Sequence, residues 1–425
     1  MLIVACSFCL VAMSLLVVGQ GIYLWLYQRK LRGAQSKTPV GDSDLVQPVG
    51  QAVIILCVRG MDPSLQKCLQ ALDVQDGPDY QIIVGMDSTD DPAFALIQSF
   101  AATANHVVTI HELNQIPRES SLKCAVLAEI VEGLDDRIHA IALVDADSIV
   151  ERDWLSTLLI PLADASVGAV TGTRWFEPPI EGRVPFGTFV RAVWNTAAIV
   201  QMHLYTIAWG GSLAMRLKTV RELNLTMQWR KMFCEDTCLT EKLQKAGLRV
   251  LHPPGLVVVN REVSTVPDVG TWLIRQLLTV RLYHEDWPWV AVHGLTVGFV
   301  TVLALLTLIT TCVFGEVRLA TSVVSGFVVY TAISWLMLYQ VYKINNRWIP
   351  LHPNRPINPG MRHAWFSWLM AIPVTQLVHL WATVRTMFAR RIEWRNVVYR
   401  CHRANVEIEQ YEPFVRCSTQ EDSIH

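Results

Sequence analysis

Long apolar stretches lie at the start of the chain and in its last third, and these constrain its fold more than any other feature. Residues 2–26 contain no charged side chain and are long enough to cross a bilayer as a helix. More apolar stretches lie near the other end, at residues 289–313, 320–341 and 366–388. Inside a bilayer such segments must be helical, because water cannot satisfy their backbone polar groups. The sequence therefore predicts a membrane-bound chain with a separate domain between these stretches.

The overall composition agrees with a membrane protein. Of the 425 residues, 52% are hydrophobic and only 17% are charged, whereas soluble proteins carry about 25% charged residues. The formal net charge of −1 provides no basic field for nucleic acid. The 10 cysteines have neither the spacing of a zinc site nor that of a disulfide framework, so we expect them to be reduced.

The charges beside the first apolar stretch predict its orientation. Arg29, Lys30 and Arg32 follow it, and an excess of positive charge marks the cytoplasmic side of a membrane span. No basic residue precedes the stretch, which favours an uncleaved anchor over a signal peptide. We therefore predict a transmembrane anchor over residues 1–27 with an outside N-terminus, a polar linker over residues 28–50, and a cytoplasmic domain after it.

The last apolar stretch differs from the others, because it contains Pro373 and Arg385. If it crossed the membrane, the basic segment 390–395 would lie outside, against the charge rule. We therefore predict a transmembrane region with a re-entrant or interfacial segment over residues 289–390. The C-terminal tail covers residues 391–425, and its polar part from Val406 to His425 is expected to be frayed.

Between the apolar stretches, strand-like and helix-like patterns alternate. Short β-branched runs are separated by segments with helical spacing. Alternation of this kind indicates an α/β fold with a mostly parallel, Rossmann-like sheet. The expected strands cover residues 52–58, 81–85, 107–110, 141–144, 167–173 and 249–259. The expected helices between them cover residues 64–72, 94–101 and 121–131.

Two further helices are expected near the membrane. Residues 185–208 mix apolar and polar side chains, which fits a helix at the membrane face and an ordinary amphipathic core helix equally well. Residues 271–281 combine apolar side chains with Arg275 and Arg281. This pattern predicts an interfacial helix within the segment 271–288 that leads the chain into the membrane.

Carboxylates gather where the expected strands end. Asp87 and Asp91 follow the second strand, and Asp145 and Asp147 follow the fourth. Open α/β sheets bind ligands at the carboxyl ends of strands, and closely spaced carboxylates suit a divalent cation that shares phosphate oxygens. The sequence has neither a GxxxxGK[ST] phosphate loop nor a GxGxxG fingerprint after the first strand. We therefore predict a nucleotide-phosphate site, with a solvated turn as the simpler alternative for the Asp-x-Asp motif alone.

Two later motifs add candidate site residues. Gly210 and Gly211 allow the backbone to approach a ligand closely because glycine has no side chain, although a simple turn explains them equally well. Glu235 and Asp236 precede a helix that stops at Gly247. An acidic pair in this position either caps the helix or supplies a general base.

These acidic motifs, taken in order, resemble those of membrane-bound glycosyltransferases of the family 2-like GT-A type, most closely the ceramide glucosyltransferase-like branch. The similarity extends from about Ala52 to Arg400. The blocks that carry it are VIILCVRGMDPSLQKCL, GMDSTDDPAF, LVDADSIV, FCEDTCLTEKLQKAG and RIEWRNVVYR. The resemblance implies a GT-A glycosyltransferase domain over residues 51–270, with membrane helices on both sides.

The resemblance also implies how a nucleotide sugar would be bound. Asp87 or Asp91 would contact the base or the ribose, and Lys123 would lie near the nucleotide. Asp145 would hold the ribose or a metal ion. Gly211, where the backbone can approach a ligand, completes the expected nucleotide-sugar site.

The chemical step depends on the remaining motifs. The resemblance implies that Asp147, together with Asp145, holds a divalent metal, Mg²⁺ or Mn²⁺, and that Asp236 is the catalytic base. Asp236 would accept the proton of the attacking hydroxyl. The metal would neutralise the charge that develops on the departing diphosphate.

One motif of the resembled family is missing. Its (Gln/Arg)-x-x-Arg-Trp stretch should fall near Arg275, where this chain has no Arg-Trp pair. Arg281 is expected to substitute for it, so we assign Glu235, Arg275 and Arg281 to the leaving-group and acceptor region. The absence also argues against a processive synthase, in which this motif holds the growing chain.

The sequence therefore predicts an inverting glycosyltransferase that moves a sugar from a nucleotide-diphospho-sugar, such as UDP-glucose, to a hydroxyl of a membrane lipid. We expect a bacterial inner-membrane protein with its catalytic domain in the cytoplasm, where nucleotide sugars are available. The alternatives are a processive polysaccharide synthase and a catalytically inactive membrane scaffold.

Overall fold

The computed structural model describes residues 1–35, 50–179, 182–346 and 364–414. The chain divides into two compact units, each assembled from separate segments. The helical unit comprises Met1–Pro39, Arg174–Ile207 and Val259–Phe388. The sheet unit comprises Val40–Thr173, Ala208–Val258 and Ala389–His425.

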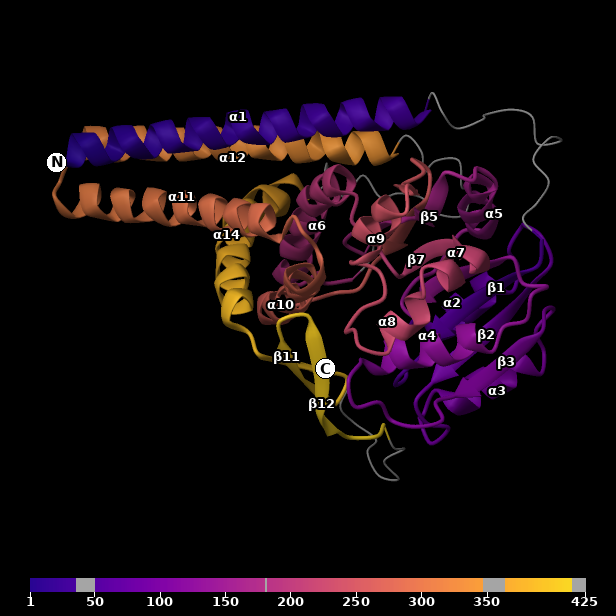
Figure 1. Ribbon diagram of the computed structural model, residues 1–425. Coiled ribbons are helices and arrows are strands. Elements are labelled where there is room, and N and C mark those ends of the chain that lie inside the picture. Colours follow the sequence, from indigo (N-terminus) through magenta and orange to yellow (C-terminus); the bar gives the residue numbers. More distant parts are fainter. Residues whose placement is uncertain (36–49, 180–181, 347–363, 415–425) are drawn as a thin grey trace. The chain divides into compact units, whose positions relative to one another are not determined.

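The sheet unit is built on a seven-stranded sheet with the strand order β3-β2-β1-β4-β7-β5-β8 (Figure 1). The first four strands are parallel to one another, and β7 is antiparallel to both of its neighbours. This confirms the predicted mostly parallel α/β sheet. The strands are β1 (Ala52–Cys57), β2 (Tyr80–Met86), β3 (Val108–Glu112), β4 (Ala140–Asp145), β5 (Val167–Thr171), β7 (Ser212–Arg216) and β8 (Arg249–Leu251).

The register of the central strands aligns their carboxyl ends. Cys57 at the end of β1 lies opposite Gly85 of β2 and opposite Asp145 of β4. The residues that follow these three strands therefore meet at one edge of the sheet. That edge is the one at which open α/β sheets bind ligands.

Helices cover the sheet and supply its hydrophobic packing. α4 (Leu122–Glu132) packs on β1, β2 and β3, and its first turn is capped by Ser121, whose side chain accepts a hydrogen bond from the Cys124 N–H at 3.1 Å. The other helices of this unit are α2 (Leu65–Leu72), α3 (Phe94–Ala101), α5 (Trp154–Leu159), α7 (Leu217–Glu222), α8 (Leu225–Trp229) and α9 (Leu239–Lys245).

The C-terminal segment is folded, which corrects the expectation of a frayed tail from Val406. It forms a three-stranded antiparallel sheet of β10 (Arg391–Trp394), β11 (Val397–His402) and β12 (Asn405–Tyr411). The alternation of buried Val406 with exposed neighbours places one face of β12 against protein. Only the part of the predicted tail beyond residue 414 lies outside the described residues.

The helical unit contains long apolar helices. α1 (Leu2–Gln35) packs along α12 (Val317–Asn346) (Figure 1). α11 (Trp287–Val313) packs against α14 (Trp365–Phe388). These four helices are long and apolar enough to cross a membrane. α6 (Phe186–Tyr205) and α10 (Val266–Tyr283) complete the unit.

Several boundaries differ from the sequence prediction. The last expected strand is broken into β8 and β9 (Val257–Asn260), because Pro253 and Pro254 lie between them and proline has no N–H for a strand ladder. β9 pairs with β6 (Thr173–Phe176) in a separate two-stranded sheet. α14 runs without interruption through Pro373. Its re-entrant or interfacial placement stays a prediction.

Most of the predicted linker, residues 36–49, lies outside the described residues.

Candidate active site

A lysine joins two of the predicted carboxylates at the carboxyl edge of the sheet. The Lys123 Nζ of α4 lies 2.8 Å from Asp145 Oδ1, at the end of β4, and 2.7 Å from Glu235 Oε1, in the loop before α9. The Glu235 side chain is only 2% exposed, and that of Lys123 is 18% exposed. Residues from three separate segments thus form one charged cluster.

The cluster sets the protonation of its members. Burial alone would lower the pKa of Lys123, but the carboxylates of Asp145 and Glu235 outweigh it and raise the pKa well above its usual value. Burial raises the pKa of Glu235, and the nearby Lys123 charge opposes this rise. Lys123 therefore remains a cation, fixed beside Asp145.

Asp236 is oriented by hydrogen bonds from both sides. The Gly210 N–H donates to its Oδ2 at 2.7 Å, and the Thr237 hydroxyl donates to its Oδ1 at 3.0 Å. The helix that follows, α9, has Cys238 as its N-cap and no side-chain capping hydrogen bond. Capping of α9 thus does not explain why this position carries a carboxylate.

The Gly210-Gly211 pair allows the carboxylates to come together. A Cβ added to Gly211 would collide with Asp145 Oδ2, and one added to Gly210 would collide with Glu235 Oε1 and lie 3.1 Å from Asp236 Oδ2. Any side chain here would push the acidic residues apart. The glycines are therefore part of the site, and β7 begins directly after them.

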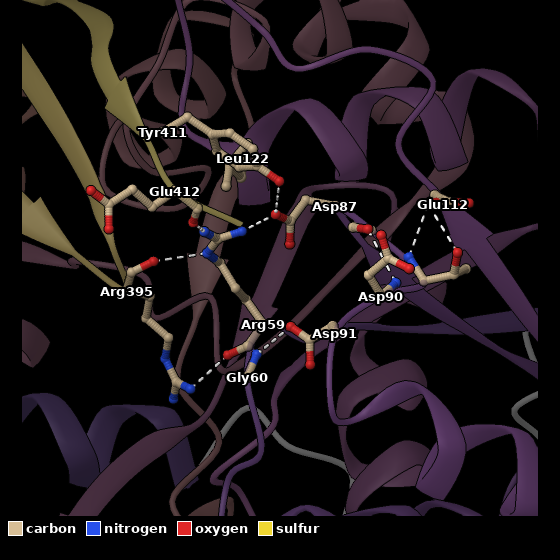
Figure 2. A network of polar contacts seen from close by, with 12 residues as sticks. Arg59, Gly60, Asp87, Asp90, Asp91, Glu112, Leu122, Arg395, Tyr411 and Glu412 are labelled. Carbon is tan, nitrogen blue, oxygen red and sulfur yellow. Dashed lines mark hydrogen bonds and ion pairs between the residues drawn. The ribbon is translucent and has the colours of Figure 1, made fainter. Parts of the chain in front are cut away.

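A second polar network surrounds Asp87, which follows β2 (Figure 2). Its Oδ2 accepts from the Arg59 guanidinium and, at 2.8 Å, from the Tyr411 hydroxyl. The Asp87 side chain is 2% exposed and that of Arg59 is 11% exposed. The C-terminal strand β12 therefore contacts Asp87, a residue predicted to belong to the nucleotide site.

Asp91 has a different environment in the same region (Figure 2). Its Oδ2 accepts from the Gly60 N–H at 2.6 Å and its Oδ1 from the Ala93 N–H at 2.8 Å. Both oxygens are thus bonded to backbone, and the residue is buried. This arrangement fixes the turn after β1 and the entry to α3.

A divalent metal ion is predicted at Asp145 and Asp147, and the side chains that could hold it are few. In the described part of the chain, His, Cys, Asp and Glu side chains form no group of three or more that would hold a metal ion. Asp145 Oδ1 is occupied by Lys123, so Asp147 is the main candidate ligand. A site of one or two carboxylates fits Mg²⁺ or Mn²⁺ when substrate phosphates supply further oxygens.

The two arginines predicted for the leaving group belong to the helical unit. Both lie on α10. The Arg281 guanidinium donates to the carbonyl oxygens of Thr386 at 2.6 Å and Met387 at 3.0 Å, at the C-terminal end of α14. The role of Arg275 and Arg281 in catalysis stays a prediction.

Sequence reasoning missed two residues of the Asp87 network. Arg59 directly follows the first expected strand, residues 52–58, so its position at the strand end was a usable signal. Tyr411 gave no signal, because it lies in a polar segment 324 residues from Asp87 along the chain.

Comparison with known proteins assigns the chain to a family. The sequence profile of glycosyl transferase family 21 matches residues 10–406. The chain matches none of the curated protein sequences compared with it at the threshold applied. Mannosyltransferase PcManGT from Pyrobaculum calidifontis, in complex with GDP-Man and Mn²⁺, is similar over 90% of this chain and 99% of that chain, with 16% identity and a TM-score of 0.51.

A more distant likeness covers a smaller part of the chain. Glucosyl-3-phosphoglycerate synthase from Mycobacterium tuberculosis aligns over 54% of this chain and 78% of that chain, with 14% identity and a TM-score of 0.35. The mannosyltransferase likeness confirms the GT-A-type fold. Because the family profile covers most of the sequence, the chain belongs to glycosyl transferase family 21 and is a glycosyltransferase.

Proposed function

We propose that the protein transfers a sugar from a nucleotide-diphospho-sugar to a hydroxyl of a membrane lipid, with inversion at the anomeric carbon. The observation that carries this proposal is the convergence of Asp145, Lys123, Glu235 and Asp236 at the carboxyl edge of the sheet. The described part of the same chain contains four helices long and apolar enough to cross a membrane. A polar transfer site and a membrane anchor together suit a lipid acceptor.

The donor is assigned to the aspartates at the strand ends. Asp87 is the better candidate for the base or ribose than Asp91, because both Asp91 oxygens already accept backbone N–H groups. Asp145 is held in one orientation by Lys123 and can accept a ribose hydroxyl. The unsubstituted backbone of Gly211 beside Asp145 gives the donor room to approach.

A divalent cation is assigned to Asp147, with Asp145 as its neighbour. PcManGT, which shares the fold, was solved with Mn²⁺ and GDP-Man. When bound, such a cation supplies positive charge at the departing diphosphate. The carboxylate of Asp147 is the group of this chain that would hold it.

Asp236 is the proposed general base. The acceptor oxygen attacks the anomeric carbon, its proton passes to the Asp236 carboxylate, and the bond between the anomeric carbon and the diphosphate oxygen breaks with its electrons on the diphosphate. A positioned base of this kind contributes about 10² to 10⁴ in rate. The hydrogen bonds from Gly210 and Thr237 hold the carboxylate in place for this transfer.

A cavity within the helical unit supports a lipid acceptor. It has a volume of about 120 Å³ and is lined by α1, α6, α11, α12 and α14. The lining is mostly apolar and includes Leu24, Val297 and Ile372, with Tyr23 and His293 among the polar residues. A hydrocarbon chain suits this cavity, because the lining is mostly apolar and four of its five helices are long and apolar enough to cross a membrane.

The proposed location of the protein is a membrane, with the sheet unit on its cytoplasmic side. Arg29, Lys30 and Arg32 after the first apolar stretch favour a cytoplasmic sheet unit by the positive-inside rule. A bacterial inner membrane is the proposed site, where cytoplasmic nucleotide sugars meet the lipid.

The test is a transfer assay on membranes that contain the protein. A panel of labelled UDP-, GDP- and ADP-sugars is offered with a total lipid extract and Mg²⁺ or Mn²⁺. Label in one lipid band, lost on chelation, is the expected result. Label in a long polymer would instead identify a processive synthase, and no transfer with no nucleotide binding would identify an inactive scaffold.

A further inference from the structure

The two carboxylate oxygens of Asp87 differ in their contacts with the protein. The Arg59 guanidinium and the Tyr411 hydroxyl each donate one hydrogen bond, and both bonds go to Asp87 Oδ2 (Figure 2). Within the part of the chain that the structure describes, Asp87 Oδ1 accepts no hydrogen bond from protein. One oxygen of this carboxylate is therefore fixed by the protein, and the other keeps its capacity to accept a hydrogen bond.

Arg59 is itself held firmly by the C-terminal segment. Its guanidinium lies over the rings of Tyr411 and Phe414, at 5.1 Å and 5.2 Å from their centroids. Its Nε donates to the Arg395 carbonyl at 2.8 Å, and Arg395 Nη1 donates to the Arg59 carbonyl at 2.6 Å. The arginine thus cannot turn away from Asp87 without disrupting several contacts.

The backbone beside Arg59 is adapted to the same segment. Gly60 has a positive φ of 73°, and a Cβ at this position would lie 3.1 Å from the Phe414 ring. Its N–H is bonded to Asp91. The turn after β1 and the end of the C-terminal sheet are therefore fitted to one another around Asp87.

We propose that Tyr411 and Arg59 are positioning residues for the donor: they hold Asp87 by Oδ2 so that Oδ1 accepts a hydrogen bond from the base or ribose of the nucleotide. The C-terminal sheet is thereby part of the nucleotide site. This inference rests on the proposed function, which assigns a nucleotide-sugar donor to Asp87. The ligand group is an N–H or O–H donor of a nucleoside diphosphate.

The test is Tyr411→Phe in the full-length protein in detergent or nanodiscs. This change removes one hydroxyl and leaves the ring over Arg59. We expect the affinity for nucleoside diphosphates (UDP, GDP, ADP and CDP, each titrated) to fall about tenfold for the preferred base, because a hydrogen bond to a charged group is lost. Inhibition by inorganic pyrophosphate should be unchanged, since it has no base or ribose. In the transfer assay the donor KM should rise by the same factor while kcat stays within about twofold.

Glu409→Gln is the matched control. Glu409 lies on the same strand and pairs with Arg391 and Arg400, and it is not one of the residues that bond Asp87. An equal loss of nucleotide affinity in both variants would show that Tyr411 acts only by stabilising the sheet, and would overturn the inference. So would an unchanged affinity in Tyr411→Phe.

Asp87→Asn separates this inference from the proposed function. If Asp87→Asn weakens nucleotide binding and Tyr411→Phe does not, the donor site stands and the positioning role is wrong. If the wild-type protein binds no nucleoside diphosphate, the proposed function fails and the inference fails with it. A weaker affinity in both variants, with pyrophosphate inhibition retained, is the result that supports both.

Discussion

Lys123 shows how single residues organise this site. It is mostly buried and has one carboxylate on each side, at 2.8 Å and 2.7 Å. A buried ion pair adds little net stability against an apolar replacement, but removing one partner leaves an uncompensated charge. The lysine therefore allows Asp145 and Glu235 to lie side by side.

Lys123→Met tests this arrangement. The buried carboxylate of Glu235 would then face the partly exposed carboxylate of Asp145. We expect the free energy of unfolding to fall by about 3 kcal/mol, together with a loss of nucleotide affinity. Thermal unfolding and nucleotide titration measure the two effects. Lys218→Met is the control, because Lys218 forms an exposed pair with Glu222 at 3.7 Å. Equal stability of the two variants would contradict the central role of Lys123.

Asp236→Asn tests the proposed base. The amide keeps the shape of the carboxylate and can still accept from Gly210, so donor binding should be preserved. We expect kcat to fall by about 10² to 10⁴, measured as lipid glycosylation at saturating donor. Glu241→Gln, on the exposed side of the adjacent helix α9, should retain full activity. Undiminished transfer by Asp236→Asn would remove Asp236 from its role.

The candidate residues differ in how far the sequence revealed them. Asp145 and Glu235 were identifiable because each is part of a short motif next to a predicted strand or helix. Their link through Lys123 was not, since it depends on the distance between segments. Tyr411 was not identifiable at all, because its partner Asp87 lies 324 residues away.

At the scale of elements, the C-terminal sheet supports the loop that carries Asp236. The ring of Tyr399 on β11 packs against Phe233 with 5.1 Å between centroids, and Phe233 lies three residues before Asp236. Tyr399 is 1% exposed. β12 also contacts another segment of the sheet unit, because the Ile408 N–H donates to the Arg118 carbonyl at 2.9 Å.

Tyr399→Ala tests this support. Truncating a fully buried aromatic side chain leaves a cavity and should cost about 3–5 kcal/mol of stability. We expect a lower melting temperature and a lower kcat, because Phe233 loses its packing partner. Tyr399→Phe keeps the ring and should retain most of both. A melting temperature unaffected by Tyr399→Ala would show that the C-terminal sheet does not stabilise this loop.

The elements that the sequence predicted are those with strong local patterns. β1 and β4 are continuous buried runs, and they were placed within one residue at each end. β7 was missed because the Gly210-Gly211 pair before it indicated a turn. β12 was missed because its alternation is carried by few apolar residues, chiefly Val406 and Ile408, among charged ones.

At the scale of the whole molecule, the chain alternates between its two units. Arg174–Ile207, which contains α6, belongs to the helical unit although sheet-unit segments precede and follow it. Ala389–His425 returns to the sheet unit after the last apolar helix. Local sequence patterns cannot predict which unit a segment joins, because this depends on which buried faces meet after folding.

Val297→Phe tests whether the helical unit receives the lipid acceptor. Val297 lines the cavity of about 120 Å³ in that unit and is 5% exposed, so a larger side chain there occupies space that a lipid chain needs. We expect the KM for the lipid acceptor to rise several-fold, while nucleotide affinity and donor hydrolysis remain unchanged because the donor residues lie in the sheet unit. Val292→Phe is the control, since Val292 lies on the same helix α11 and is 52% exposed. A cavity that only reflects loose packing would respond with a change in melting temperature and no change in acceptor KM. That result would show that the cavity does not bind the lipid acceptor and that the acceptor binds elsewhere.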